Sequence, residues 1–382
     1  MPYEPYLTEE HDQLRATIQK FVEKEISPYV DEWEAAGEFP RNLFERMGEL
    51  GFLGFHYPES VGGQGGDYFT KLVLAEELNK CGCGGVPMAI AVQTDMATPP
   101  IYKFGNADQH ERFLTPAIRG EKIAAIGITE TNNGSDVQGI QTRARRDGDE
   151  WVINGTKTFI TNGTKADFVI LVTRTSDEPG ADGISLFLVD TDTPGFSVGK
   201  KLDKVGMRSS DTAELIFDQV RVPNENLLGE EGKGFYQIMW QLQGERMIGA
   251  AGAIGGADFA YEQALNYARN RIAFEQPISR FQVISHLLAE MKTEMEVCRE
   301  LTYATAYRFS KGEVPAKEIS MTKLSAVQMA HWVADRALQI HGGHGYMAEY
   351  PIERNWRDSR LPRIGGGTDE IMKEIIAKQM EI

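Results

Sequence analysis

The 382-residue chain has few of the residues that form disulfide frameworks and metal sites. Its three cysteines, Cys81, Cys83 and Cys298, cannot all pair, and a single C-x-C spacing does not match a zinc site. Seven histidines occur without an H-E-x-x-H spacing, and His341 and His344 around a Gly-Gly turn are too weak a pattern for a metal. We therefore expect no metal, reduced cysteines and a cytoplasmic protein, because disulfides are rare in reducing compartments.

An excess of positive charge and long apolar runs are missing as well. Lysine and arginine number 40 against 56 aspartates and glutamates, so the formal net charge is −16. This charge repels a phosphate backbone and argues against a nucleic-acid partner. No uninterrupted run of about 18 apolar residues occurs. The acidic start Met1–Pro5 lacks the basic and then apolar pattern of a targeting peptide. We expect no membrane span and no leader peptide, so the protein is either cytoplasmic or a mature form from which a leader has already been cleaved.

The hydrophobic period changes twice along the chain, which indicates three domains. Residues 1–121 and 231–382 have the 3.6-residue period of helices, whereas residues 122–230 contain short β-branched and aromatic runs between turns. We predict an α+β fold with an N-terminal helical domain, a central antiparallel β-barrel or sandwich, and a C-terminal four-helix bundle. The longer predicted helices are 41–50, 68–81, 87–104, 107–119, 232–269, 279–311, 315–342 and 368–378. The predicted strands are 151–153, 156–161, 168–173, 184–189 and 213–222, with a hairpin turn at Asn154-Gly155 and a weaker turn signal at Asn162-Gly163.

A carboxylate interrupts the apolar stripe of the helix predicted at 232–269. The stripe contains Ile238, Leu242, Glu245, Gly249 and Gly252. A stripe of this kind packs into a core, where a lone carboxylate is costly unless it is paired or faces a cavity. The glycines would leave room for a ligand, as a general base facing a buried substrate requires. On the helix pattern alone, the alternative is that the neighbouring arginine or water neutralises the carboxylate at a helix surface.

Four separated segments have further patterns. Each of them alone fits a polar turn, a strand end or a solvated helix. Together with the α–β–α order they resemble the acyl-CoA dehydrogenases, a flavoprotein family, from about Leu7 to the end of the chain. The segments are I-G-I-T-E-T-N-N-G-S-D at 126–136, F-I-T and then N-G at 159–163, R-I-A-F at 271–274 with Gln282 and Q-I-H-G-G at 339–343, and I-G-G-G-T-D-E at 364–370.

The resemblance implies FAD as cofactor. Thr129 would hydrogen-bond the pyrimidine edge of the flavin, Phe159 would lie over the ring and Thr161 would donate to flavin N5. Residues 131–133 are Thr-Asn-Asn where the family usually has Pro-Gly-Ala. The residues that the resemblance assigns to the flavin are Ile126, Ile128, Thr129, Gly134, Ser135, Phe159, Ile160 and Thr161.

The resemblance assigns the adenine and pyrophosphate end of FAD largely to a neighbouring subunit. Arg271 suits a pyrophosphate because a guanidinium offers a charged fork of donors. The residues assigned to the cofactor from the last third are Arg271, Phe274, Gln282, Gln339, Ile340, His341, Gly342, Gly343, Thr368, Asp369 and Glu370.

The catalytic base is expected at Glu245. Most relatives have it as the Glu of a Y-E-G-T segment, where this chain has Gly366. The long-chain and isovaleryl branches have it instead in an E-R pair on the preceding long helix, which Glu245-Arg246 resembles. The backbone N–H of Gly366, with a ribityl hydroxyl of FAD, would bind the thioester oxygen. The residues assigned to the substrate are Ser135, Tyr236, Arg246, Gly366 and Gly367.

The resemblance therefore implies FAD-dependent α,β-dehydrogenation of an acyl-CoA to a trans-2-enoyl-CoA, with a long or branched acyl chain. The floor of the acyl pocket is expected within 87–100, including Met88, Ala89, Val92 and Met96. Electrons would pass to an electron-transfer flavoprotein, and the assembly would be a homotetramer, a dimer of dimers. Two alternatives remain open: a related oxidase that passes electrons to oxygen, and a flavin-binding assembly protein with little turnover.

Overall fold

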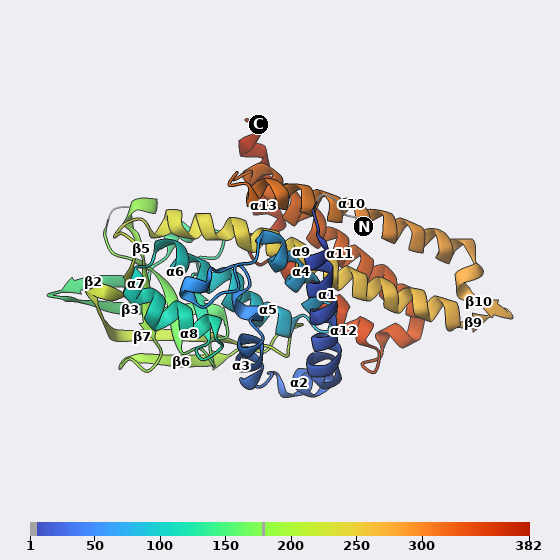
Figure 1. The fold of residues 1–382 in the computed structure, drawn as a ribbon, viewed down its shortest axis with the longest axis horizontal. Helices are drawn as coiled ribbons and strands as arrows, with labels where there is room; N and C mark the ends of the chain where they lie inside the picture. Colours follow the sequence, from blue (N-terminus) through green and yellow to red (C-terminus); the bar gives the residue numbers. More distant parts are fainter. Residues whose placement is uncertain (1–5, 178–179) are drawn as a thin grey trace.

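The computed structural model describes residues 6–177 and 180–382; the prediction about Met1–Pro5 lies outside them. The chain forms an N-terminal helical part, a central β-sheet and a C-terminal helical part, as predicted (Figure 1). The N-terminal α-helices are α1 (Glu9–Phe21), α2 (Val30–Ala36), α3 (Asn42–Glu49), α4 (Tyr68–Leu78), α5 (Gly85–Ala91), α6 (Thr98–Phe104), α7 (Ala107–Gln109) and α8 (Thr115–Ile118).

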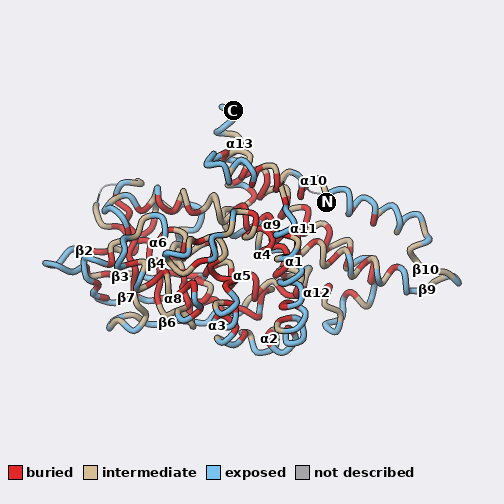
Figure 2. Tube along the Cα trace, viewed as in Figure 1, coloured by how far each residue is buried: buried red, intermediate tan, exposed pale blue. Residues whose placement is uncertain are grey.

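Helix α4 lies at the centre of the molecule and packs against both α1 and the long helix α9 (Gly234–Asn270). Its residues 71–78 are all buried, which explains the absence of a polar face. Figure 2 shows the buried stretches gathering around α4, α9 and α5. The wider π-helical turn Val92–Ala97 joins α5 to α6, so the helix predicted at 87–104 is confirmed with a change of pitch.

The central sheet is open and does not close into a barrel. Most neighbouring strands are antiparallel, whereas β4 pairs in parallel with both β1 and β2. Strand β4 is buried on both faces: Val169 and Leu171 enter one core, and Phe168, Ile170 and Val172 enter the other. The order along the sheet is β6-β7-β3-β2-β4-β5-β8, with β1 beside β4. The strands are β1 (Ala124–Gly127), β2 (Arg143–Asp147), β3 (Glu150–Thr161), β4 (Phe168–Arg174), β5 (Ile184–Asp190), β6 (Phe196–Lys201), β7 (Thr212–Pro223) and β8 (Leu227–Leu228).

The hairpin predicted at Asn154-Gly155 is wrong. Both residues lie inside β3, where the pairing with β7 shifts register, and Gly155 has a φ of +149°. A side-chain carbon at Gly155 would lie 2.7 Å from Thr142 Cα, so the glycine allows close approach of two backbones. The tight turn instead follows Asp147, which pairs with Glu150 across β2 and β3.

The four long helices predicted in the last third are confirmed, and a short helix and a hairpin were not predicted. Helices α9, α10 and α11 pack side by side, and α13 packs on α11. Small side chains at Ala257, Ala260 and Ala264 let α9 approach its neighbours closely. Helix α9 runs from the sheet to the β9–β10 hairpin at the far end (Figure 1). The elements after α9 are β9 (Ile272–Ala273), β10 (Gln276–Pro277), α10 (Gln282–Ser310), α11 (Ala316–His341), α12 (Pro351–Asp358) and α13 (Asp369–Gln379).

Candidate functional site

Glu245 of α9 and Gly366 of the loop before α13 lie side by side. A side-chain carbon at Gly366 would stand 3.1 Å from Glu245 Oε1, and Gly366 has a φ of +65°, a left-handed conformation that favours glycine. The glycine at position 366, where most relatives have the catalytic Glu, is therefore next to the Glu that this chain has at position 245. A side chain at position 366 would crowd the carboxylate that α9 brings to the same place.

The Glu245 carboxylate is held by a neighbour on its own helix. Gln241, four residues earlier, donates through Nε2 to Glu245 Oε2 at 2.8 Å. Burial raises the pKa of Glu245, whereas the Gln241 hydrogen bond and the charges of Arg246 and Lys323 lower it in part. A carboxylate with a raised pKa is a stronger base than one in water, which suits proton abstraction.

Two buried cations fix the carbonyl groups of the loop. Arg246 Nε donates to the carbonyl oxygen of Gly366 at 3.1 Å, and Lys323 Nζ on α11 donates to that of Gly367 at 2.6 Å. Burial lowers the pKa of Lys323 to about 8. In the described part of the chain, the N–H of Gly366 has no hydrogen-bond acceptor. The loop therefore presents a free donor beside Glu245.

Lys323 and Gln241 were not predicted as site residues. Gln241 has a signal in the sequence, because residues four apart face each other on a helix. Lys323 has none, since its contact with the loop joins residues 44 positions apart.

Gly249 and Gly252, the two glycines on the stripe that contains Glu245, have different roles. The expectation that both leave room for a ligand is therefore wrong for one of them. Gly249 is exposed, with no atom within 4 Å of an added side-chain carbon, so it leaves open space. Gly252 instead faces Asn79 of the N-terminal part at 2.7 Å. Only the first of these glycines can leave room for a ligand, whereas the second allows α9 to pack closely.

Two segments predicted to bind the flavin ring meet in the β domain. The N–H of Thr158 donates to the carbonyl oxygen of Thr129 at 2.9 Å, which joins β3 to the loop after β1. The buried side chain of Lys157, the residue before Thr158, makes two contacts with the same loop. Its Nζ lies 2.8 Å from Glu130 Oε1 and donates to the carbonyl oxygen of Ile128 at 3.0 Å. This pair was not predicted; it anchors the loop that contains Thr129 and Ile128.

Phe159 is held in an unusual conformation at the edge of this region. Its φ is +61°, and its side chain is 65% exposed despite being a large aromatic. It lies where β3 shifts register against β7, between Lys157 and Ile160. Such strain in a non-glycine residue persists where the surroundings require it, which is common at binding sites. Thr161 is half-buried, Ile160 is buried, and Gly134 and Ser135 are exposed.

These features fit the flavin ring of FAD. An exposed aromatic ring on a strained bulge provides a surface for a planar group, beside half-buried Thr129, Ile126 and Thr161. No described side chain contacts Phe159 in an aromatic pair. Donor groups and an exposed aromatic ring of the kind that an isoalloxazine requires are therefore present where the loop after β1 meets β3.

The residues predicted to bind the adenine end of FAD lie around the β9–β10 hairpin, at the end of the molecule away from the β-sheet (Figure 1). Arg271 and Phe274 are exposed on or beside the β9–β10 hairpin, and the Phe274 side chain is 89% exposed with a φ of +50°. Within one chain, these residues do not meet Thr129 or Phe159. Gln282, Gln339, Gly342 and Gly343 are exposed near the same end, whereas the side chains of Ile340 and His341 are buried.

The remaining predicted residues occupy varied positions. Thr368 caps α13 by accepting from Ile371 N at 3.3 Å, and the buried Asp369 accepts from Arg363 and Gln328. Glu370 is exposed, as is Tyr236. Tyr236 lies nine residues before Glu245, about 2.5 turns, so it faces the opposite side of α9.

None of the helices in residues 6–177 and 180–382 has both the length and the apolar character of a bilayer span. Over the same residues, no group of three or more His, Cys, Asp or Glu side chains could bind a metal ion.

Comparison with known sequences gives the family. Profiles of the acyl-CoA dehydrogenase N-terminal, middle and C-terminal domains match residues 8–121, 125–220 and 232–381. The rat long-chain specific acyl-CoA dehydrogenase is 43% identical over 97% of this chain and 86% of its own length. The rat short-chain specific enzyme is 40% identical over 97% and 90%.

Solved structures agree. An acyl-CoA dehydrogenase from Geobacillus kaustophilus superposes with a TM-score of 0.96 at 43% identity, covering 99% of this chain and 100% of that one. A glutaryl-CoA dehydrogenase from Mycobacterium smegmatis in complex with FADH2 superposes with a TM-score of 0.93 at 31% identity, covering 98% and 95%. The chain therefore belongs to the acyl-CoA dehydrogenases, FAD-dependent oxidoreductases that act on the CH–CH group of an acyl-CoA.

Proposed function

We propose that this protein oxidises the Cα–Cβ bond of an acyl-CoA thioester to a trans-2-enoyl-CoA, with Glu245 as the base that takes the pro-R α-proton. The main support is the position of Glu245 Oε1, 3.1 Å from where a side chain of Gly366 would begin. The carboxylate thus borders a loop whose backbone is free to bind a thioester. Its raised pKa fits the removal of a weakly acidic proton.

Gly366 would stabilise the charge that develops on the thioester oxygen. Its N–H is unoccupied among the described residues, and the adjacent carbonyl groups are fixed by Arg246 and Lys323. A donor whose position is set before the reaction stabilises an oxyanion without reorganisation.

FAD, when bound, supplies the acceptor for the β-hydride. Thr129, Phe159 and Thr161 would hold its ring, and the exposed Arg271 and Phe274 of a second copy would hold its far end. We therefore infer a homotetramer, assembled as a dimer of dimers. The separation of the two residue groups within one chain (Figure 1) supports a second copy at each site, and the tetramer itself follows from the resemblance to the family.

We further propose a long or branched acyl chain as substrate. The support is the E-R pair on α9 with a glycine in the loop, the arrangement that resembles the long-chain and isovaleryl branches. The identities of 43% and 40% to the rat long-chain and short-chain enzymes are too close to decide chain length. An electron-transfer flavoprotein is the proposed electron acceptor. A cytoplasmic location fits the three cysteines, all of which are free.

Anaerobic mixing with a panel of acyl-CoAs tests the proposal. The oxidised-flavin absorbance should bleach, and the fastest substrate should be a long or branched acyl-CoA. An FAD-loaded protein that no acyl-CoA bleaches would contradict the activity. Bleaching that is fastest with short straight chains would contradict only the substrate class. Rapid reoxidation by air with release of peroxide would instead indicate an oxidase.

A further inference from the structure

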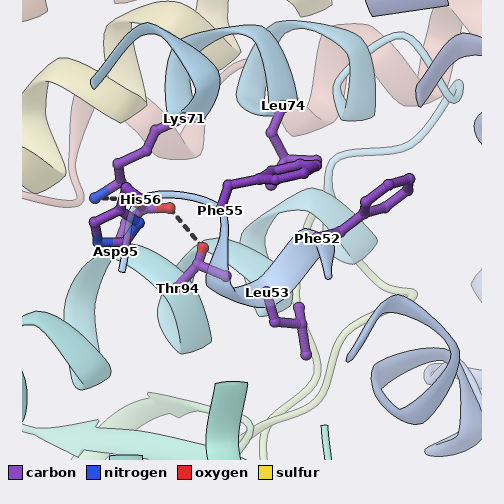
Figure 3. Close-up of a pocket in the computed structure, with 8 residues that line it drawn as sticks. All are labelled: Phe52, Leu53, Phe55, His56, Lys71, Leu74, Thr94 and Asp95. Carbon is purple, nitrogen blue, oxygen red and sulfur yellow. Dashed lines mark hydrogen bonds and ion pairs between the residues drawn. The ribbon is translucent and has the colours of Figure 1, made fainter. Parts of the chain in front are cut away.

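Three lysines are buried in the part of the chain that the structure describes, and one of them has no carboxylate partner there. Lys71 Nζ lies 2.7 Å from Asp95 Oδ1 (Figure 3). Lys157 Nζ lies 2.8 Å from Glu130 Oε1. Lys323 Nζ, on α11, has no carboxylate oxygen of a described residue within ion-pair distance, about 4 Å. A buried lysine without a paired charge is costly, so its position needs a reason.

The ammonium group of Lys323 contacts the loop of the proposed site. Its Nζ donates to the carbonyl oxygen of Gly367 at 2.6 Å, and the residue is only 3% exposed. An ammonium has three N–H donors, and within residues 6–177 and 180–382 this carbonyl oxygen is the only acceptor that Lys323 reaches. The helix therefore holds the loop at the residue after Gly366, whose N–H has no acceptor in the same part of the chain.

Asp369, at the start of α13, is the acidic residue whose charge acts most strongly on Lys323, but its carboxylate is already paired. Arg363 donates to Asp369 Oδ2 through Nη2 at 2.6 Å and through Nε at 2.9 Å. Burial lowers the pKa of Lys323 to about 8. The charges of Arg246 and Arg363 act in the same direction, whereas those of Asp369 and Glu245 oppose it. At neutral pH the side chain is therefore mainly a charged ammonium, and it is not part of a direct ion pair.

The charge of Lys323 also acts on the proposed base. Burial raises the pKa of Glu245, and the charge of Asp95 adds to this effect. The charges of Arg246 and Lys323 lower the same pKa. Lys323 and Glu245 thus stabilise each other's charged form although they are not in contact. This matters for the reaction, because a carboxyl group must be ionised before it can accept a proton.

We propose that Lys323 is a positioning residue for proton abstraction, whose ammonium group holds the Gly366–Gly367 loop and supplies the counter-charge that keeps Glu245 ionised. This inference rests on the proposed function. A hydrogen bond from a buried cation on a long helix sets the place of the Gly367 carbonyl group, and with it that of the preceding N–H, before a substrate binds. The positive charge favours the ionised base without a direct ion pair that would occupy its oxygen atoms.

Two neutral substitutions of Lys323 test the inference on the intact, FAD-loaded protein. The limiting rate constant of anaerobic flavin reduction is measured against pH for Lys323→Met and Lys323→Gln, with the acyl-CoA that reduces the wild type fastest. Both variants lose the positive charge, so the inflection assigned to Glu245 should move upward. In Lys323→Met the rate constant above the inflection should also fall about tenfold, because the Gly367 carbonyl group loses its donor and the loop its fixed position.

Lys80→Met is the matched control and should keep the wild-type pH profile. The half-buried Lys80 lies 3.7 Å from Asp258, which is 13 residues, about 20 Å, further along α9 than Glu245.

The melting temperature of Lys323→Met should not fall, because the variant removes an unpaired buried charge. A lower melting temperature with an unchanged inflection would indicate a purely structural role and overturn the inference. An inflection that stays in place or moves downward in both neutral variants would also overturn the inference alone. A wild-type protein whose flavin no acyl-CoA reduces would overturn the proposed function with it.

Discussion

The two ends of α9 place predicted site residues in opposite surroundings. Near its beginning, Glu245 is surrounded by partners from the same chain: Gln241 on its own helix, the Gly366 loop and the cations that fix it. Just beyond its end, Arg271 and Phe274 are exposed on a hairpin. The groups proposed for proton abstraction are complete within one chain, whereas those proposed for the cofactor's far end need a second one.

Because of this difference, substitutions at the two places should impair different properties, the reaction in one case and FAD binding in the other. Changes at the Glu245 end should alter the reaction while FAD stays bound. Changes at the hairpin end should weaken FAD binding without disturbing the fold of the chain. The predictions below test this separation, from the largest effect to the smallest.

Gly366→Leu should have the largest effect on turnover. The new side chain would begin 3.1 Å from Glu245 Oε1 at a φ of +65°, so the carboxylate or the loop must move. We expect flavin reduction to slow by about a hundredfold or more, because positioning errors of this size disrupt the reacting geometry. Gly365→Ala is the matched control, since its nearest neighbour is a backbone oxygen at 3.9 Å. Equal rates in both variants would contradict the arrangement.

The rate of flavin reduction should depend on pH through Glu245. A protonated carboxyl cannot accept a proton, so the rate should fall about tenfold per pH unit below the pKa of Glu245. Burial raises this pKa above the ordinary 4.5, so the inflection should lie above that value. Gln241→Leu removes a hydrogen bond that favours the carboxylate and should move the inflection upward. An inflection that moves downward in this variant would be inconsistent with Glu245 as the titrating group.

Arg271→Ala/Phe274→Ala should weaken FAD binding by about tenfold or more, because a charged hydrogen bond and an aromatic contact are lost. The melting temperature of the apoprotein should not change, since both side chains are exposed. Arg145→Ala, at an exposed position on β2, is the control and should keep the wild-type dissociation constant, measured by flavin fluorescence. Unchanged FAD affinity in the double variant would place the adenine end elsewhere.

Alanine substitutions at two glycines of α9 should change the free energy of unfolding of the protein in opposite directions. Gly249→Ala should raise the free energy of unfolding by about 0.5–1 kcal/mol, because Gly249 is exposed with open space around it. Gly255→Ala should lower it by about 1–3 kcal/mol, because the new carbon would lie 2.1 Å from the Glu76 carbonyl oxygen. Denaturant unfolding of the two variants measures both changes, and equal effects would contradict the close packing of α4 on α9.

Periodicity predicted the long helices and the three-part order because these depend on contacts repeated along each element. The Asn154-Gly155 turn shows where local signals fail. A strong hairpin dipeptide lies inside β3 because pairing with β7 and the close approach of Thr142 outweigh the local turn preference. The turn between β2 and β3 is formed instead by Gly148 and Asp149, between the paired residues Asp147 and Glu150.

The pairing of Glu245 with the Gly366 loop could be expected only through resemblance to a family. Nothing in the spacing of residues 245 and 366 indicates that they touch, and the structure supplies this contact. Lys323 has no sequence signal, because its contact with the Gly367 carbonyl group joins elements distant in the chain.

Exchange of the α-proton tests the role of Glu245 most directly. The FAD-loaded protein is incubated in D2O with an acyl-CoA analogue that cannot lose a β-hydride, and deuterium at the α-carbon is followed by mass spectrometry. The wild type should exchange this proton, and Glu245→Gln should slow the exchange by about a thousandfold while retaining FAD. Exchange at the wild-type rate in Glu245→Gln would contradict the assignment of Glu245 as the base.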